Sequence, residues 1–415
     1  MNDPEYDLVV FGATSFVGTI MTQYLAEHFS SQAEPARWAI AGRSKSKLEE
    51  VRRSLGAAGE SLPILVADAT DEDQLHALCA QTRVVVSTVG PYALYGEPLL
   101  KACAETGTDY CDLTGETQWI KRMIDKHEAT ARETGARIVH CCGFDSVPSD
   151  MGVYFLQQKA LERWGAPATS VTMRVKSLKG GASGGTVASI INIVEEATAD
   201  PALRKALLNP YYLCPPDHGF TARQHWVKTA EFDPGFEEWA APFVMAAVNE
   251  RVVHRSNALA GKAYGHQFTY NEGMLTGTGI RGRAAALALV AGLGAFMASA
   301  AIKPARSLMQ KYVLPKPGEG PSPEAQEAGR YDIRFIGKND NGETLRVKVT
   351  GEGDPGYGSS SKILGQAVAS LALDHAKNGT KTGRPGGSWT PATMFDERFI
   401  ERLTRHAGMR FEVVD

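Results

Sequence analysis

The chain has 415 residues, of which 43% are hydrophobic and 22% charged, and its formal net charge is -3. This composition is typical of a globular protein with two domains, and the lack of a basic excess argues against a nucleic-acid partner. The six cysteines form no CxxC pair and no metal-ligand spacing, so we expect buried thiols in a reducing cytoplasm and no metal site. The N-terminal residues lack the pattern of a signal peptide, which also favours a cytoplasmic protein.

The first third of the chain alternates short apolar runs with longer helical patterns. The predicted strands are Tyr6–Phe11, Trp38–Gly42, Ile64–Ala67, Val84–Val89, Tyr110–Leu113 and Ile138–Cys142. The predicted helices are Phe16–Phe29, Lys45–Leu55, Glu72–Gln81, Pro98–Thr106 and Thr117–Thr134. Nearly continuous apolar strands joined by helices predict an α/β domain over residues 1–148, with a doubly wound parallel sheet of the Rossmann type.

The first strand and the first helix are joined by GATSFVG, a glycine-rich turn typical of dinucleotide binding. Gly12 can take the tight turn, and Gly18 lets the helix pack closely on the strand. The residues whose backbone N–H groups could face a pyrophosphate are Thr14, Ser15, Phe16 and Val17. Ser15 stands where glycine is usual, but its hydroxyl could donate to a phosphate oxygen. A merely structural turn is the alternative.

The end of the second predicted strand indicates which dinucleotide is bound. Arg43 and Ser44 follow this strand, and no carboxylate is present to bind a ribose 2′-hydroxyl. A cation here attracts a 2′-phosphate, so the sequence favours NADP(H) over a merely solvated basic loop. Asp68, after the third strand, could accept from the adenine amine. Gly90 and Pro91 form a turn after the fourth strand, at the edge where cofactors bind.

The rest of the chain predicts a second α+β domain over residues 149–358, for substrate binding or dimer formation. A strand over Ser170–Lys179 and a hairpin over 331–350, turning at Asn341-Gly342, predict a mixed sheet. The loop KGGASGGTVAS precedes a predicted helix at Val187–Thr198, and it could bind an anion or serve as a flexible turn. Residues 359–415, with a helix at Lys362–Asp374, are expected to pack back on the first domain.

An alanine-rich stretch at residues 284–302 carries no charge. Basic residues bound it at both ends: Arg281, Arg283, Lys303 and Arg306. Its length is about the minimum for a membrane span, but alanine is a weak driver of insertion. Three interpretations stay open: a buried or dimer-interface helix, an interfacial helix with its basic flanks near anionic head groups, and a true span.

Several segments together resemble one enzyme family. In the first part of the chain they are VVFGATSFVG, AGRSKSKL, VVSTVGPYALYGEPLLKACAETGTDYCDLTGE and CGFDSVPSD; later ones are RSNAL at Arg255–Leu259, PKPGEGPS at Pro315–Ser322 and TPATMFDERFIERL at Thr390–Leu403. Their combination is similar to the saccharopine dehydrogenase-like oxidoreductases, and most similar to the branch of the mycobacterial trans-acting enoyl reductases. The chain departs from this family at Ser15, where glycine is usual.

This resemblance implies an NADPH-dependent reductase. In the mycobacterial branch, the implied role is to saturate an enoyl intermediate made by a polyketide synthase, on the way to glycolipids. The expected substrate is therefore a small or carrier-bound acyl group, with a polyketide synthase as partner. We further expect a homodimer, in the cytoplasm or held peripherally at a membrane.

Enoyl reduction needs a hydrogen-bond donor to the substrate carbonyl and a proton for the α-carbon. Tyr92, in the turn after the fourth strand, is the predicted acid, and Asp145 and Ser146, after the sixth, are predicted to orient the reacting groups. The structural alternatives are that Tyr92 stacks on the nicotinamide and that Asp145 caps a turn or helix.

Two rival functions remain open. An amino-acid dehydrogenase of the saccharopine type would need converging arginines, for which Arg223, Arg251 and Arg255 are available. A non-catalytic, nucleotide-binding scaffold associated with a membrane is the other rival. A long apolar tunnel would favour the enoyl reductase, and a compact arginine-lined pocket would favour the dehydrogenase.

Overall fold

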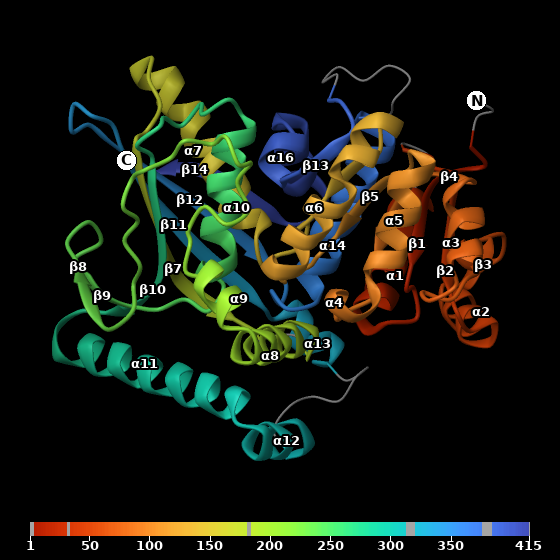
Figure 1. The fold of residues 1–415 in the computed structure, drawn as a ribbon, viewed down its shortest axis with the longest axis horizontal. Helices are drawn as coiled ribbons and strands as arrows, with labels where there is room; N and C mark the ends of the chain where they lie inside the picture. Colours follow the sequence, from red (N-terminus) through yellow and green to blue (C-terminus); the bar gives the residue numbers. More distant parts are fainter. Residues whose placement is uncertain (1–3, 31–33, 181–183, 313–319, 376–383, 415) are drawn as a thin grey trace. The chain divides into compact units, whose positions relative to one another are not determined.

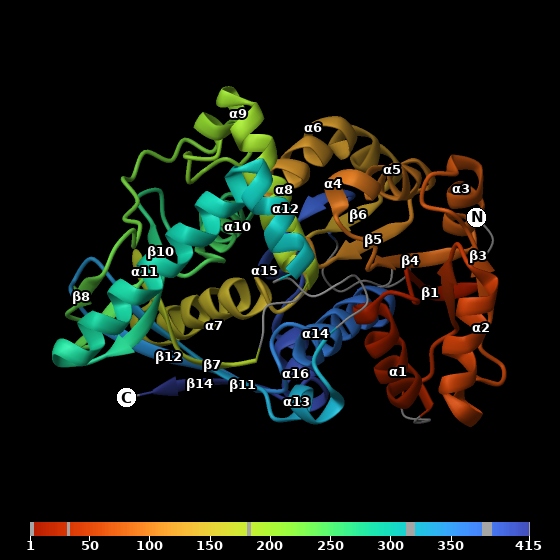
Figure 2. The same ribbon diagram turned by 90° about the horizontal axis from the view of Figure 1, so that it is seen from below.

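The computed structural model describes residues 4–30, 34–180, 184–312, 320–375 and 384–414, and these form two compact units (Figures 1 and 2). The first unit contains the described residues up to Phe144, together with Gly320 and Tyr357–Ala407. The second unit contains the described residues of Asp145–Lys316, Pro321–Gly356 and Gly408–Asp415. The chain therefore enters the second unit directly after the sixth strand, and it returns to the first unit near its C-terminal end.

The first unit is built on a seven-stranded parallel sheet. Its strands are β1 (Tyr6–Phe11), β2 (Trp38–Gly42), β3 (Ile64–Val66), β4 (Thr82–Ser87), β5 (Asp109–Asp112), β6 (Arg137–Val139) and β13 (Gly387–Trp389). The strand order is β13-β6-β5-β4-β1-β2-β3, and all pairs are parallel. The predicted Rossmann-type sheet is confirmed, and the C-terminal segment adds β13 at its edge. β6 ends earlier than expected because Cys141 takes a left-handed backbone with φ 64°.

Helices pack around this sheet. Those of the N-terminal part are α1 (Phe16–Ser30), α2 (Lys45–Ser54), α3 (Glu72–Cys79), α4 (Tyr92–Tyr95), α5 (Glu97–Thr106) and α6 (Thr117–Thr134), with a short 3₁₀ turn, η1, at Gly56–Gly59. The C-terminal helices are α14 (Gly358–Ala369), a π-helical turn η2 (Ser370–Asp374), α15 (Pro391–Met394) and α16 (Glu397–His406). α14 packs against α1 within this unit. The helix predicted at Lys362–Asp374 is thus an α-helix that ends in a π-helical turn.

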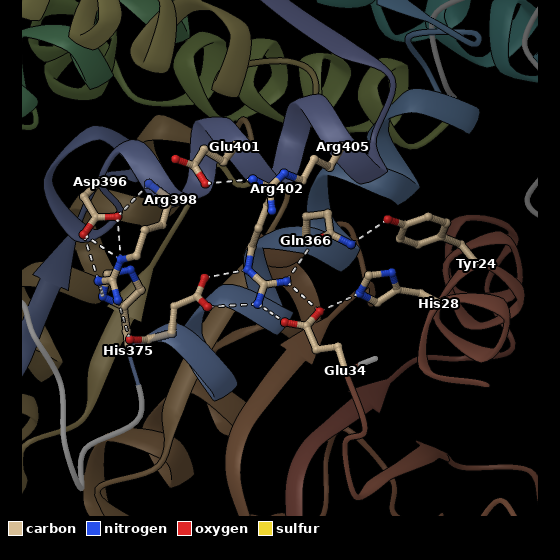
Figure 3. A network of polar contacts seen from close by, with 11 residues as sticks. Tyr24, His28, Glu34, Gln366, His375, Asp396, Arg398, Glu401, Arg402 and Arg405 are labelled. Atoms are coloured by element: carbon tan, nitrogen blue, oxygen red, sulfur yellow. Dashed lines mark hydrogen bonds and ion pairs between the residues drawn. The ribbon is translucent and has the colours of Figure 1, made fainter. Parts of the chain in front are cut away.

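A polar network ties α16 to the rest of the first unit (Figure 3). The Arg402 guanidinium of α16 makes ion pairs with Glu34 and Asp374 and donates to Gln366. His28 of α1 contacts the same Glu34 carboxylate at 2.9 Å. Arg402 is only 8% exposed, and its ion pairs to the two partly exposed carboxylates fix the C-terminal helices.

The second unit is built on a mixed seven-stranded sheet. Its strands are β7 (Ser170–Lys179), β8 (Glu231–Asp233), β9 (Glu238–Ala241), β10 (Thr269–Gly277), β11 (Arg330–Lys338), β12 (Thr344–Glu352) and β14 (Met409–Val414), in the order β14-β12-β11-β7-β10-β9-β8. β7 and β10 are parallel, and the other neighbours are antiparallel. The predicted hairpin is confirmed as β11 and β12, with Gly342 at φ 81° in its turn.

Seven helices of the second unit fall among the described residues. They are α7 (Val147–Trp164), α8 (Gly184–Ala199), α9 (Pro201–Ala206), α10 (Ala246–Leu259), α11 (Gly279–Ala301), α12 (Lys303–Tyr312) and α13 (Pro323–Glu327). α7 packs against β11 and β12, and the absence of a side chain at Gly152 admits the Phe335 ring. α11 contains the alanine-rich stretch, and only 11% of its most apolar window is buried. The interpretation of this stretch as a buried core helix is therefore wrong.

Candidate nucleotide-binding and active site

The turn between β1 and α1 requires both of its glycines. Gly12 has φ 88°, and a Cβ atom there would lie 2.7 Å from a methyl group of Val89. A Cβ atom on Gly18 would lie 2.2 Å from the Gly12 carbonyl oxygen. A side chain fits at neither position. Glycine at both positions therefore allows the tight turn in which α1 begins close to the end of β1. This is the geometry that a pyrophosphate site needs.

Ser15 is part of the internal hydrogen bonding of this turn. Its hydroxyl oxygen accepts from the Gly18 N–H at 2.9 Å and lies 2.9 Å from the Thr88 hydroxyl. Since the Thr88 hydroxyl donates to the Gly12 carbonyl at 2.9 Å, the Ser15 hydroxyl is left to donate to Thr88. This arrangement argues against the prediction that the Ser15 hydroxyl donates to a phosphate. Sequence reasoning missed Thr88, which stands directly after β4.

The first turn of α1 leaves backbone donors for an anion. Thr14, Phe16 and Val17 are partly exposed, and the first N–H groups of a helix have no partner within it. The Phe16 ring packs edge-on against Tyr357 at 4.6 Å and lies over Gly320, where a Cβ atom would clash with it. The side chain of Phe16 is therefore occupied, and only its backbone can serve a cofactor.

Arg43 and Asp68 lie at the carboxyl ends of β2 and β3. Arg43 is exposed, and Ser44 caps α2 by accepting from the Lys47 N–H. One Asp68 carboxylate oxygen accepts from the Thr70 N–H and hydroxyl at 2.9 and 2.8 Å. These bonds, and secondarily the Arg43 charge, lower the pKa of Asp68. Arg43 thus presents an accessible cation at the position where the sequence analysis expects the 2′-phosphate.

Tyr92 follows the cis Gly90–Pro91 peptide and points into the first unit. Its hydroxyl donates to the Ser87 carbonyl at 2.8 Å and accepts from the Leu113 N–H at 3.4 Å. Its ring packs 5.4 Å from the Trp119 ring, and burial raises the pKa of the hydroxyl well above its usual range. A buried phenol that already donates to the backbone has no proton to give a substrate, so the geometry argues against the acid role predicted for Tyr92.

A residue missed in the sequence holds the start of α4. The buried Glu116 carboxylate accepts from the backbone N–H groups of Tyr92 and Ala93, at 2.8 and 3.1 Å. These are donors of a helix N-terminus, which a carboxylate satisfies well. The signal in the sequence was an acidic residue in the short loop before α6, but its partner lies in a different loop.

Asp145 is the first residue of the second unit and directly follows Phe144, whose N–H donates to the Ser360 hydroxyl at 3.0 Å. The Asp145 carboxylate accepts from the Thr186 hydroxyl of α8 at 3.2 Å. Burial raises the pKa of Asp145 to about 6. A carboxyl group with this pKa is half protonated near pH 6 and about one tenth protonated at pH 7.

Ser146 is buried, and its hydroxyl group forms a hydrogen bond within the second unit. Its hydroxyl donates to the Asn249 side-chain oxygen of α10 at 2.9 Å. The Asn249 amide nitrogen in turn donates to Glu272 of β10 and to Ser149 of α7. Asp145 and Ser146 are thus neighbours in the chain with different partners. Ser146 holds the start of α7, as a positioning residue would.

The arginines required by the rival dehydrogenase do not form an accessible cluster. Arg251 donates to the carbonyls of Ala247 and Leu207, and Arg255 donates to the Leu213 carbonyl at 2.6 Å. Both are buried, whereas Arg223 is exposed. Two of the three arginines therefore contact backbone carbonyls of their own unit.

The remaining sequence hypotheses concern a loop, the cysteines and metals. Residues 181–183 of the glycine-rich loop before α8, and most of the PKPGEGPS segment, lie outside the described residues. All six cysteines are free and buried, as expected. Among the described residues, no group of three or more His, Cys, Asp or Glu side chains is placed to hold a metal ion.

Comparison with known proteins agrees with this geometry. Residues 8–139 match the family model described as the saccharopine dehydrogenase NADP binding domain. A solved structure of Saccharomyces cerevisiae saccharopine dehydrogenase superposes with a TM-score of 0.53 and covers 98% of this chain and 99% of that chain. At 14% sequence identity, this likeness concerns the fold alone.

Two curated relatives match nearly the whole chain. A Mycobacterium tuberculosis protein, provisionally named a trans-acting enoyl reductase, is 41% identical over 96% of this chain and 95% of its own length. A trans-acting enoyl reductase of Mycobacterium bovis is 36% identical over 96% of both chains. The chain therefore belongs to the family of saccharopine dehydrogenase-like oxidoreductases that includes these proteins, and it is an NADP-dependent oxidoreductase.

Proposed function

We propose that this protein is an NADPH-dependent enoyl reductase that saturates a C=C bond of a polyketide or lipid intermediate. The observation that carries this proposal is the similarity to relatives named trans-acting enoyl reductases, which extends over 96% of the chain. The burial of Arg251 and Arg255 supports it over the amino-acid dehydrogenase, since that reaction needs arginines that can reach carboxylates. A carrier-bound acyl group is the proposed substrate, and a polyketide synthase the proposed partner.

The residues of the first unit fit the cofactor. We assign the pyrophosphate to the tight turn bounded by Gly12 and Gly18, where neither residue has room for a Cβ atom. Backbone N–H groups of Thr14, Phe16 and Val17 complete this assignment, whereas the Ser15 N–H donates to the Gly12 carbonyl at 2.9 Å and shapes the turn. Arg43 and Ser44 are assigned to the 2′-phosphate, Asp68 to the adenine, and Gly90 and Pro91 to the nicotinamide side. When bound, NADPH supplies the hydride that adds to the β-carbon of the enoyl group.

The chain itself must supply the proton and hold the substrate. Hydride addition leaves negative charge on the carbonyl oxygen, and the α-carbon then takes a proton. We propose Asp145 as the proton donor in place of Tyr92, because its carboxyl group is partly exposed, is held by the Thr186 hydroxyl, and has a pKa raised to about 6. Thr186 orients the Asp145 carboxyl group, and Ser146 fixes the chain beside it through Asn249.

The cellular setting follows from the same assignment. We propose that the enzyme works in the cytoplasm, where NADPH and reduced thiols are available. The homodimer expected from the sequence stays a prediction, and size-exclusion chromatography with light scattering would measure it.

The experiment that tests the function is a paired titration with NADPH and NADH, followed by an assay for oxidation of NADPH by enoyl thioesters. Arg43→Ala should weaken NADPH binding about tenfold and leave NADH unchanged, because a charge-assisted contact to the 2′-phosphate is lost. Lys45→Ala, an exposed cation two residues away, is the matched control.

The two measurements separate the cofactor assignment from the substrate. An equal loss of NADPH and NADH binding in Arg43→Ala would contradict the assignment of Arg43 to the 2′-phosphate. Tight NADPH binding without turnover of any enoyl thioester, short or long, would instead contradict the enoyl reductase and favour the non-catalytic scaffold.

A further inference from the structure

The helix α11 exposes an apolar surface that the described residues leave uncovered. Ile280 is 89% exposed and Leu287 48% exposed, and the residues between Ala284 and Ala301 include no charged side chain. The mean hydropathy of its most apolar 18-residue window is 1.9, although only 11% of that window is buried. Helices with apolar residues all round normally lie in a core or in lipid. α11 lies along the outer side of the second unit (Figures 1 and 2).

The opposite side of α11 is attached to its own unit. Gly282 and Ala286 are buried where the helix packs on β9 and β10. Towards its end, Ala300 packs with Ile191 of α8 and Met309 of α12, and Phe296 lies against this cluster. Because a stripe of α11 is held by the second unit over both halves of the helix, the helix is not free to leave it and cross a bilayer alone.

The charges on α11 and on its flanks in the sequence have one sign, although Arg306 pairs with Glu195 of the neighbouring α8 at 2.9 Å. Arg281 and Arg283 stand exposed at its beginning, and Lys303 stands exposed just after its end. Glu272 and Glu319 are the nearest acidic residues in the sequence on either side, so the whole interval between them is free of carboxylates. An apolar face between cations complements a surface whose interior is hydrocarbon and whose rim is anionic.

We propose that the exposed face of α11, with the cations at its two ends, docks the protein on an anionic lipid surface. The helix lies in the plane of the interface: its apolar side chains enter the acyl region, and Arg281 and Lys303 contact head groups. A second copy of this chain would also cover the apolar face. Its cations would then lie beside the same cations of the first copy, which is unfavourable.

This surface is connected to the candidate active site within the second unit. α11 packs against α8, and α8 carries Thr186, whose hydroxyl donates to Asp145. A docked α11 therefore places the element that orients the candidate acid beside the lipid. An enzyme whose substrate has a long acyl chain gains from this placement, because such chains partition into membranes.

The test is co-sedimentation of the full chain with vesicles of phosphatidylcholine alone or mixed with phosphatidylglycerol. We expect binding to the anionic vesicles, and Ile280→Gln with Leu287→Gln should weaken it at least about tenfold by removing apolar contacts. Arg281→Gln or Lys303→Gln should weaken it about fivefold each, and added salt should act in the same direction. Leu161→Gln with Leu208→Gln, exposed leucines outside α11, should bind as the wild type does.

The outcomes separate lipid from other occupants. Thermal unfolding of each variant, with the same midpoint as the wild type, reports that the fold of the second unit is intact. Failure of the wild type to bind anionic vesicles would overturn the proposal, and equal binding to neutral vesicles would overturn its electrostatic part. A wild-type dimer that becomes a monomer in the Ile280→Gln, Leu287→Gln variant, without vesicle binding by either, would assign this face to a second copy.

Discussion

Asp7 and Glu34 of the first unit differ from Asp145, Glu250 and Glu272 of the second unit in the direction of their pKa shifts. In the first unit, burial alone would raise the pKa of Asp7, but hydrogen bonds from the Arg37 side chain and backbone N–H lower it. The pKa of Glu34 falls to about 2, through its bond to His28 and then through Arg402, against the effect of burial. These carboxylates stay charged and tie segments together.

In the second unit, burial decides the pKa of three carboxyl groups. It raises the pKa of Asp145 to about 6, and that of Glu272 to about 7 against its hydrogen bonds from Tyr270, Ser149 and Asn249. Burial, and then the nearby Glu272 charge, raise the pKa of Glu250 to about 8. The second unit therefore exchanges protons near neutral pH, whereas the paired carboxylates of the first unit do not. A carboxyl group that has no ion-pair partner is therefore the better candidate for a proton donor.

The largest effect should come from breaking the pairing in the first unit. Arg402→Ala leaves Glu34 and Asp374 without their shared cation, so the free energy of unfolding should fall by about 3 kcal/mol in urea denaturation. Arg405→Ala, on the same helix but exposed, should change it by less than about 0.5 kcal/mol. Equal effects of the two substitutions would mean that the network of Figure 3 adds little stability.

In the second unit, we expect a smaller change in the free energy of unfolding, and of opposite sign, from a substitution at Glu250. Since Glu250 has a higher pKa folded than unfolded, the wild type should lose stability as pH rises from about 4.5 towards 8. Glu250→Gln removes this loss and keeps an acceptor for the Glu272 N–H, which Glu250 now binds at 3.2 Å. The variant should be at least about 2 kcal/mol more stable at pH 9 and nearly equal to the wild type near pH 4.5. Thermal unfolding across this range measures the difference, and a constant difference at all pH values would contradict a titrating Glu250.

The fold could be read from the sequence where its signals are local. Buried parallel strands such as β1 and β4 are continuous apolar runs, and the Asn-Gly pair predicts the hairpin turn. β13 could not be predicted, because three residues without an apolar run join the sheet only through β6. β8 and β9 are similarly short.

In the candidate site too, features that depend on neighbouring residues could be predicted, and features that depend on distant residues could not. Gly12 and Gly18 follow from spacing, because a backbone requirement is local. The role of the Ser15 hydroxyl depends on Thr88, and that of the Tyr92 hydroxyl depends on Ser87, whose carbonyl faces it only in the folded unit. The raised pKa of Asp145 depends on burial beside α8, which no short motif encodes.

The smallest expected stability effect, and the sharpest test of the comparison, is Asp145→Asn. Asparagine can still accept from the Thr186 hydroxyl but carries no charge, so the variant should gain at least about 1 kcal/mol at pH 8. Because the folded pKa is about 6 and the usual value 3.8, the gain should disappear as pH falls towards 4. Urea denaturation at the two pH values measures it.

The same substitution should nearly abolish enoyl reduction while NADPH binding is kept, since general acids contribute about 10² to 10⁴ in rate. In the wild type, kcat/KM should fall as pH rises above about 6, as Asp145 loses its proton. Thr186→Val removes the hydrogen bond that favours the charged form, so it should move this fall to higher pH. A variant that gains stability but keeps its rate would show that the Asp145 carboxyl group has a raised pKa without being the proton donor. Burial and catalysis at this residue are thus separable: the first is read from stability against pH, the second from rate against pH.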